Sequence, residues 1–347
     1  MPLSEILARS QRLRENMTLE NLFALICSDE KKVAARYLKG EMEYAITYGE
    51  YKARAFACAA ALRRQLGAPG KDAFIAIQLD TCPEWFSLFW GVMAAGYNAV
   101  LLDATLNETM TGHMLEEAGA VALIGRKPRA LPVSLPQFTA DSLWNAPADP
   151  AFRPSFGTMV ALCTSGTTAT SRIFVYDQQA ICSQVLNSEL LYRENQRIIC
   201  DKPGRNLAFL PYHHVFGFMV CLQWIHFIGY ENIYLHDRSP QTIQDTCRRF
   251  HVTHLIAVPL LANNLSAGLS RKLAKEKRFK RMAFKSMRGT SLALQAVAPG
   301  MGLDLARKHM FKNVVSQMLG PDIRCIILGG SHTPKKHMRT LSALGYY

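Results

Sequence analysis

A regular alternation of helix patterns and short apolar runs constrains this chain more than any other feature of its sequence. Between residues 50 and 124, three helical patterns alternate with strand patterns at 73–79, 98–102 and 120–124. Thr47 and Glu50 have the spacing of a capping box before the first helix, and Gly67 can end it. Strands separated by helices pair in parallel through right-handed crossovers. The sequence therefore predicts an α/β fold with helices on both faces of a mostly parallel sheet.

A proline-rich segment at 127–154 interrupts this alternation. It holds six of the 16 prolines, and proline lacks the amide hydrogen that helices and sheets use. Strand and helix patterns resume at 158–163 and continue to a helix that begins near Pro334. We therefore expect residues 1–347 to form two stacked lobes, at about 40–126 and 155–347, joined by the connector at 127–154.

Two uncharged stretches approach the roughly 20 residues that a membrane-spanning helix needs. The first, 85–102, contains Gly96 and Asn98, where a helix ends and a strand begins. The second, 207–230, contains Pro211 and three histidines, which are costly in hydrocarbon. Buried helix–strand units explain both stretches better than membrane-spanning helices do. Because no cysteine pair has C-x-x-C spacing and the N-terminus is not signal-like, we expect a cytoplasmic protein with reduced thiols.

The segment after the strand at 158–163 carries the clearest chemical signal. From Thr164 to Thr170 it holds five hydroxyl side chains and one glycine, and Arg172 follows. Hydroxyls, backbone amides and a guanidinium are groups that bind polyphosphate, although a Ser/Thr-rich surface turn has the same composition. The chain has neither a Walker-type G-x-x-x-x-G-K-[ST] loop nor a G-x-G-x-x-G turn after a strand, which argues against P-loop and dinucleotide-binding enzymes. Thr333 replaces the closing glycine of a hydrolase elbow, so a serine hydrolase is disfavoured.

Three further segments follow in order along the chain. Residues 210–217 read Leu-Pro-Tyr-His-His-Val-Phe-Gly, residues 252–259 read Val-Thr-His-Leu-Ile-Ala-Val-Pro, and residues 328–334 read Leu-Gly-Gly-Ser-His-Thr-Pro. Together with 163–173, they resemble the ordered motifs of the AMP-forming adenylate-forming enzymes, which include acyl-CoA synthetases, luciferases and peptide-synthetase adenylation domains. The resemblance runs through nearly the whole chain and implies the large N-terminal domain of acyl-CoA synthetases.

The resemblance also implies site residues. It places the β- and γ-phosphates of ATP at residues 164–172, the phosphate loop. It places adenine beside Gly329 and Gly330, the Gly-Gly turn. It also places the acyl substrate beside His213 and His214, the histidine pair, of which His214 is the candidate catalytic residue. A packed or solvated histidine pair is the alternative for the last of these. The phosphate-binding candidates are Thr164, Ser165, Gly166, Thr167, Thr168 and Arg172; the adenine candidates are Gly329, Gly330 and Ser331; the acyl-site candidates are His213, His214 and Gly217.

The reaction that the resemblance implies is ATP-dependent activation of a carboxylic acid to acyl-AMP, followed by transfer of the acyl group to CoA. Mg²⁺ is the implied metal, and the sequence does not identify its ligands. The stretch at 305–320 resembles long-chain acyl-CoA synthetases and favours a fatty acid. An aryl-acid or amino-acid adenylating enzyme and a non-catalytic nucleotide- or acyl-binding module are the alternatives.

Two departures from the family pattern bear on catalysis. Ala169, Ser171, Arg172 and Ile173 stand where the family loop has Gly, Pro, Lys and Gly. Arginine keeps the charge but presents a planar fork in place of a point charge. The family's aromatic-Gly-x-Thr-Glu motif would come only after Tyr347, so we expect a truncated N-terminal part that lacks the C-terminal lid and is inactive alone.

Residues 271–288 hold nine basic residues and one acidic residue, Glu276, within a chain of net charge +13. A solvated helix face is the simplest explanation. The functional explanation is that these cations attract CoA phosphates or an anionic membrane surface. Nucleic acid is disfavoured, because only Phe279 and Phe284 interleave with the cations. The expected partners are a small carboxylic acid, ATP and CoA, with peripheral membrane contact left open.

Overall fold

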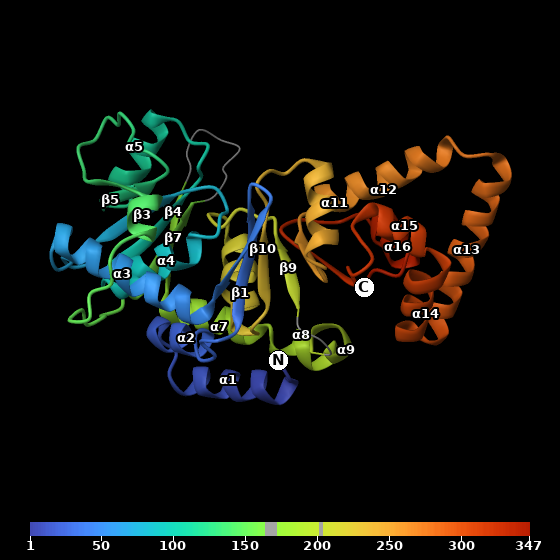
Figure 1. Ribbon diagram of the computed structural model, residues 1–347, viewed down its shortest axis with the longest axis horizontal. Helices are drawn as coiled ribbons and strands as arrows, with labels where there is room; N and C mark the ends of the chain where they lie inside the picture. The colour runs from blue at the N-terminus through green and yellow to red at the C-terminus, as the bar shows by residue number, and fades with distance from the viewer. Residues whose placement is uncertain (164–171, 201–203) are drawn as a thin grey trace. The chain divides into compact units, whose positions relative to one another are not determined.

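The computed structural model describes residues 1–163, 172–200 and 204–347. The chain divides into two compact units. Unit 1 consists of Met1–Pro203 and Leu210–Tyr234, and unit 2 consists of Gly204–Phe209 and Leu235–Tyr347. Each unit combines helices with mostly parallel strands (Figure 1), which confirms the α/β fold predicted from the sequence.

The main sheet of unit 1 has six strands in the order β6-β5-β3-β4-β7-β8. These strands are β3 (Phe74–Gln78), β4 (Asn98–Leu102), β5 (Ala120–Gly125), β6 (Gln137–Thr139), β7 (Met159–Cys163) and β8 (Ile173–Asp177). All neighbours pair in parallel except β8, which runs antiparallel to β7 at the edge. β3 and β4 are buried along their whole length, as parallel strands covered on both faces are.

A second group of strands in unit 1 has β1 at its centre. β1 (Val33–Lys39) pairs in parallel with β10 (Glu231–Tyr234) and antiparallel with β2 (Met42–Thr47). The helical segments of unit 1 are α1 (Leu3–Glu15), α2 (Leu19–Ile26), α3 (Tyr48–Leu66), α4 (Trp85–Ala94), α5 (Glu108–Glu117), α6 (Ala140–Trp144), α7 (Gln178–Asn187), α8 (Glu189–Glu194), α9 (Gln196–Ile199), the π-helix η1 (Gly217–Trp224) and α10 (Ile225–Phe227).

Local capping signals explain where α3 begins and ends and where α5 begins. The Thr47 hydroxyl accepts a hydrogen bond from the amide of Glu50, and the Glu50 carboxylate accepts one from the amide of Thr47, so the predicted capping box is confirmed. Gly67 ends α3 at a φ of +80°, which favours glycine. Asn107 caps α5 through the amide of Met110.

Unit 2 has a parallel set of strands in the order β12-β11-β9. Its elements are β9 (Arg205–Ala208), α11 (Pro240–Arg249), β11 (His254–Ala257), α12 (Pro259–Ala274), α13 (Arg278–Val297), α14 (Pro299–Leu305), the π-helix η2 (Ala306–Met310), α15 (Lys312–Met318), β12 (Cys325–Leu328) and α16 (Lys335–Ala343). Ser239 caps α11, where Pro240 occupies the first helical turn and needs no amide partner.

The division between the units differs from the one expected at the proline-rich connector. β7 starts the expected second lobe, yet it pairs with β4 and belongs to the main sheet of unit 1. The connector itself contributes β6, which pairs with β5, and the short helix α6. The expected boundary is based on the prolines of the connector. Proline content does not predict which strands pair, as β7 with β4 and β6 with β5 do here.

None of the helices within the described ranges is both long and apolar enough to cross a membrane. The nine cysteines form no disulfide, and most are buried. Burial raises the pKa of Cys58 and of Cys247 to about 12, so these thiols stay protonated at neutral pH.

Candidate functional site

The carboxyl ends of β3, β4 and β7 lie at one edge of the main sheet of unit 1. The parallel pairs Gln78↔Leu102 and Leu101↔Leu162 fix this alignment. Open α/β sheets bind ligands at the carboxyl ends of their strands. The predicted phosphate loop begins directly after Cys163, the last residue of β7, so its attachment point lies at this edge.

Most of the predicted phosphate-binding residues fall outside the part of the chain that the structure describes. These residues are Thr164, Ser165, Gly166, Thr167 and Thr168. Arg172 is described, and it is exposed directly before β8. Since Cys163 and Ile173 are paired across β7 and β8, Arg172 lies at the same edge of the sheet as the end of β7.

The histidine pair of unit 1 is joined to this same edge. The rings of His213 and His214 lie 4.2 Å apart, and His213 is buried. Nε2 of His213 lies 3.4 Å from Oδ2 of Asp103, which follows β4. The Thr81 hydroxyl, after β3, donates a 2.9 Å hydrogen bond to the carbonyl of Leu210. The segment 210–217 is therefore attached to the loops after two neighbouring strands.

Asp103 is held in its charged form. Partial burial raises its pKa, but the amide and hydroxyl of Thr105 both donate to Oδ1, and the histidine pair adds a further lowering. The net result is a pKa below the ordinary value for aspartate. At neutral pH His213 therefore faces a carboxylate, which can orient its ring.

Gly217 is required by a close backbone approach. A Cβ atom at this position would lie 2.0 Å from the carbonyl oxygen of Pro211. The amide of His214 also contacts the Pro211 carbonyl, at 3.4 Å, so the segment folds back on itself before η1 begins. π-helices are rare, and those that do occur are often found at functional sites. Gly217 therefore closes a tight turn that carries the histidine pair, and its role at the acyl site stays a prediction.

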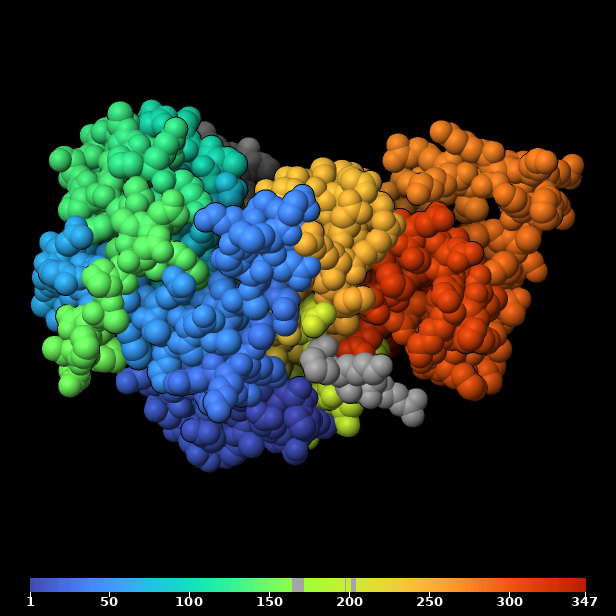
Figure 2. Space-filling view, in the orientation of Figure 1, coloured from blue at the N-terminus to red at the C-terminus, as the bar shows by residue number. Residues whose placement is uncertain are grey.

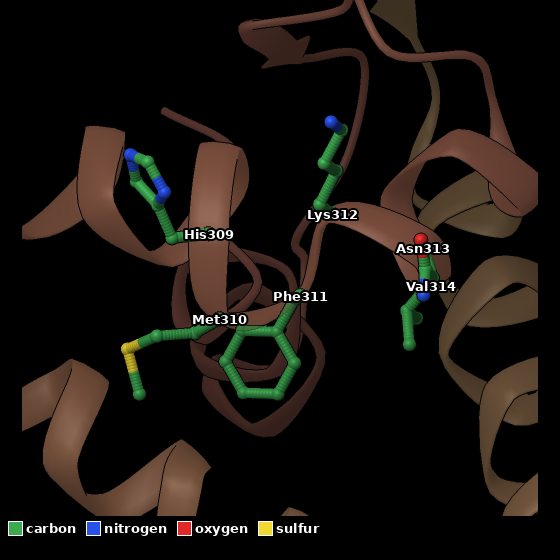
Figure 3. A pocket seen from close by; sticks show the side chains of 6 residues that line it. All are labelled: His309, Met310, Phe311, Lys312, Asn313 and Val314. Carbon is green, nitrogen blue, oxygen red and sulfur yellow. The ribbon is translucent and has the colours of Figure 1, made fainter.

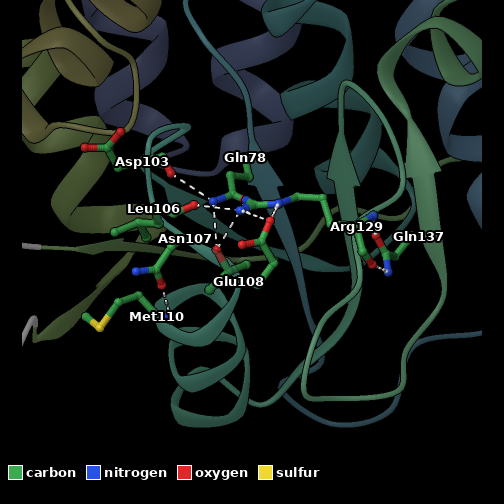
Figure 4. Close-up of polar contacts among 9 residues, drawn as sticks. Gln78, Asp103, Leu106, Asn107, Glu108, Met110, Arg129 and Gln137 are labelled. Atoms are coloured by element: carbon green, nitrogen blue, oxygen red, sulfur yellow. Dashed lines mark hydrogen bonds and ion pairs between the residues drawn. The ribbon is translucent and has the colours of Figure 1, made fainter.

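Arg129 organises the loops behind Asp103 (Figure 4). Its guanidinium donates to the side-chain oxygen of Gln78 and to the carbonyl of Leu106, each at 2.9 Å, and pairs with Glu108 at 2.9 Å. The Gln78 amide in turn donates to the carbonyl of Asp103 at 3.0 Å. The sequence analysis did not identify these residues. The position of Gln78 and Asp103 at strand carboxyl ends is the signal that could have found them.

The predicted adenine residues belong to unit 2. The Gly-Gly turn follows β12, whose Leu328 pairs in parallel with Ala257 of β11. The amide of Gly329 donates to the carbonyl of Ala257 at 3.1 Å, and Gly330 has a φ of +87°, which favours glycine. Ser331 is exposed. The turn is thus fixed to the carboxyl edge of the strands of unit 2, with its free side open to solvent.

The described residues show one pocket that none of the predicted site residues lines, and they hold no three-ligand metal group. Among residues 1–163, 172–200 and 204–347, no three His, Cys, Asp or Glu side chains are placed to hold a metal ion, so no residue is assigned to Mg²⁺. A pocket of about 220 Å³ in unit 2 is lined by residues 309–314 (Figure 3). Its side chains point in different directions, and none is a predicted site residue.

Solved structures of adenylate-forming enzymes share this fold. The N-terminal subdomain of NpsA from Klebsiella oxytoca, in complex with 3-hydroxybenzoyl-AMSN, matches with a TM-score of 0.67 and 15% identity over 94% of this chain and 70% of that chain. MenE, the o-succinylbenzoate CoA synthetase of Bacillus subtilis in complex with OSB-AMP, matches with a TM-score of 0.65 and 17% identity over 94% of this chain and 56% of that chain. The nonribosomal peptide synthetase FmoA3 with bound AMPPNP matches with a TM-score of 0.65 and 15% identity, over 94% of this chain and 30% of that chain.

No curated protein sequence matches the chain. The family model described as AMP-binding enzyme matches residues 28–346. That span includes the phosphate loop, the histidine pair and the Gly-Gly turn, so the resemblance seen in the separate motifs extends over the sequence between them. The chain belongs to the AMP-binding enzyme family.

Proposed function

We propose that this protein activates a fatty acid with ATP and transfers the acyl group to CoA. The observation that carries the proposal is the attachment of the histidine pair to the sheet edge where β7 ends, through Asp103 and Thr81. An acid held beside His214 would then lie near the start of the loop that the family uses for ATP phosphates. Such positioning supplies much of the rate enhancement in reactions between two bound substrates.

The proposed chemistry has two steps. A carboxylate oxygen of the acid attacks the α-phosphorus of ATP, the bond to the β-phosphate oxygen breaks, and acyl-AMP and pyrophosphate form. The CoA thiol then attacks the acyl carbonyl, loses its proton, and AMP leaves. Arg172 and the hydroxyls of Thr164–Thr168 would neutralise and orient the phosphates, and Gly329, Gly330 and Ser331 would border adenine. Mg²⁺, where bound, would offset phosphate charge.

An aryl acid is the second candidate substrate. The reported NpsA complex holds a 3-hydroxybenzoyl analogue and the MenE complex holds OSB-AMP. The long, basic α12–α13 region and the stretch at 305–320 support a fatty acid instead. Amino-acid adenylation and nucleotide binding without turnover are tested by the same experiment.

The experiment measures ATP-dependent pyrophosphate release with fatty acids, benzoic acids and amino acids, with and without CoA. It uses the 347-residue chain and, in parallel, the longest protein that its gene encodes. We expect acyl-AMP with fatty acids, acyl-CoA once CoA is added, and turnover only where a C-terminal lid is present. Preference for benzoic acids would replace the substrate assignment. ATP binding without pyrophosphate release from either protein would show a binding module.

A further inference from the structure

The positive charge of this protein is concentrated in unit 2. That unit holds 20 of the 40 Lys and Arg residues but 5 of the 27 Asp and Glu residues. Nine of its cations lie in residues 271–288, which join the end of α12 to the first half of α13 and are named the elbow here. Figure 2 shows the elbow, in orange, standing away from the other atoms of unit 2. The charge is thus gathered on a projecting feature.

All but one of the cations of the elbow lack an ion-pair partner among the described residues. All nine are exposed, and Lys280 pairs with Glu276 at 2.9 Å. The other eight form no ion pair with any residue that the structure describes. Like charges on neighbouring helix turns repel each other. An anionic surface would relieve that repulsion at several positions at once.

One face of α13 packs against the rest of unit 2. The ring of Phe284 lies 5.2 Å from that of Phe311, in an edge-to-face arrangement. The hydroxyl of Ser291 donates to the carbonyl of Ala343 at 2.8 Å, and the Gln295 amide donates to the carbonyl of Ser342 at 2.8 Å. These contacts hold the helix in place and fix which of its faces is turned outward.

The outward face of α13 carries apolar side chains beside a row of cations. Phe279 and Met282 are 68% and 63% exposed, and they lie three residues apart, so they share one face. Val297 continues that face toward the end of the helix and is 87% exposed. The cation row beside it consists of Arg278, Arg281, Lys285 and Arg288, spaced by three or four residues. Exposed apolar residues flanked by cations on one helix are typical of helices that lie in a membrane interface.

We propose that this outward face of α13 binds an anionic lipid surface, with Phe279 and Met282 inserted among the headgroups and the cation row on the lipid phosphates. An anionic lipid surface can bind both kinds of side chain, because its phosphates attract the cations and its interface accepts the exposed apolar side chains. Single-stranded nucleic acid needs several stacking rings, and Phe284 is occupied by Phe311. The proposal is independent of the enzymatic activity proposed above.

The test is cosedimentation of the 347-residue chain with vesicles of phosphatidylcholine alone and of phosphatidylcholine mixed with phosphatidylglycerol. We expect binding to the mixed vesicles only, weakening as salt is raised. Each cation near an anionic surface changes the partition coefficient about fivefold, so replacing Arg278, Arg281, Lys285 and Arg288 with Gln should lower binding at least about tenfold. The double variant Phe279→Ser, Met282→Ser should also lower binding, since it keeps every charge but removes the inserted groups.

A matched control separates the elbow from net charge. Replacing Lys39, Arg64, Lys71 and Lys127 with Gln removes the same charge from exposed positions of unit 1 and should leave vesicle binding unchanged. All variants are checked for an unchanged unfolding midpoint. Equal loss in the control and the elbow variant would overturn the proposal, as would full binding by the Ser double variant. Retention on DNA or on an acidic protein without vesicle binding would assign the face to that partner instead.

Discussion

Arg129 donates a 2.9 Å hydrogen bond from Nη1 to Oε1 of Gln78, a residue 51 positions earlier in the chain. This bond ties the proline-rich connector to the carboxyl end of β3. The same Gln78 side chain donates to the carbonyl of Asp103, and Asp103 faces His213. Arg129 lies in the predicted connector. Two hydrogen bonds thus link it to Asp103, the residue that faces the candidate acyl site.

Arg129→Ala should destabilise unit 1. The change leaves the Gln78 oxygen and the Leu106 carbonyl without their donor, and each unsatisfied partly buried group costs about 1–3 kcal/mol. We expect a loss of about 2–4 kcal/mol in the free energy of unfolding, measured by urea titration. Glu108→Gln is the control, since it removes only an exposed ion-pair partner and should change stability little. Equal effects of the two substitutions would show that the ion pair, not the buried network, matters.

Gly217→Ala should disrupt the turn that carries the histidine pair. Its Cβ would collide with the Pro211 carbonyl, which is backbone and cannot rotate away. We expect a loss of about 2 kcal/mol or more and a displaced His213. Gly268→Ala is the matched control, because Gly268 lies inside α12 with nothing near its missing Cβ. That substitution should stabilise by about 0.5–1 kcal/mol. A harmless Gly217→Ala in the same urea titrations would mean that the turn relaxes freely.

Local signals in the sequence were sufficient for many elements, and pairings between distant segments were not predictable. The capping box of α3 and the buried strand β3 depend on neighbouring residues, and both are confirmed. β8 is absent from the predicted elements, although its first four residues are β-branched or aromatic and favour strands. Phe174 and Val175 in it are exposed, as residues of an edge strand can be. Its place in the sheet depends on pairing with β7, which local propensity does not encode.

The same distinction applies to the site. The Gly-Gly turn and the histidine pair are recognisable from short motifs, and each lies at the carboxyl edge of parallel strands within its own unit. The Asp103–His213 contact and the Arg129 network join residues far apart in sequence, and no spacing rule identifies them. Five of the predicted phosphate-binding residues lie outside the described residues, so their roles remain predictions.

His226 should make the stability of unit 1 depend on pH. It is fully buried among Tyr48, Tyr51 and Phe86, and burial lowers its pKa to about 4, against the opposing hydrogen bond with the Leu222 carbonyl. Since an unfolded histidine titrates near 6.5, the unfolded state binds its proton first as pH falls. The neutral histidine therefore contributes fully above pH 6.5, and stability falls between about pH 6.5 and 4, by up to about 3 kcal/mol.

Urea midpoints measured from pH 7 to pH 4 test this dependence. His226→Gln should lower stability at pH 7 but flatten the decline across that window, because glutamine takes up no proton. A variant with the same slope as the wild type would show that other groups control the acid sensitivity.

Gln223→Met should stabilise the protein. Gln223 is fully buried in η1, and neither atom of its amide has a hydrogen-bond partner among the described residues. Replacing an unsatisfied buried amide with an unbranched apolar side chain should raise the free energy of unfolding by about 1–2 kcal/mol. The control is Gln78→Met, the same change at a buried glutamine whose amide is bonded, and it should destabilise. The unfolding temperatures of both variants give the comparison. Lower stability in both variants would contradict the conclusion that the Gln223 amide is unsatisfied.

The proposed function requires ATP binding at the phosphate loop, and calorimetric titration of ATP tests that binding most directly. A charged hydrogen bond contributes about 1.5–3 kcal/mol, so Arg172→Ala should weaken binding about tenfold or more. Thr167→Val should also weaken it, because a methyl group cannot donate, whereas Arg172→Lys restores the usual family residue and should be tolerated. Arg64→Ala removes an exposed charge at the end of α3 and serves as the control. Unchanged affinity in both Arg172→Ala and Thr167→Val would contradict the proposed function, since the loop would then not bind phosphate.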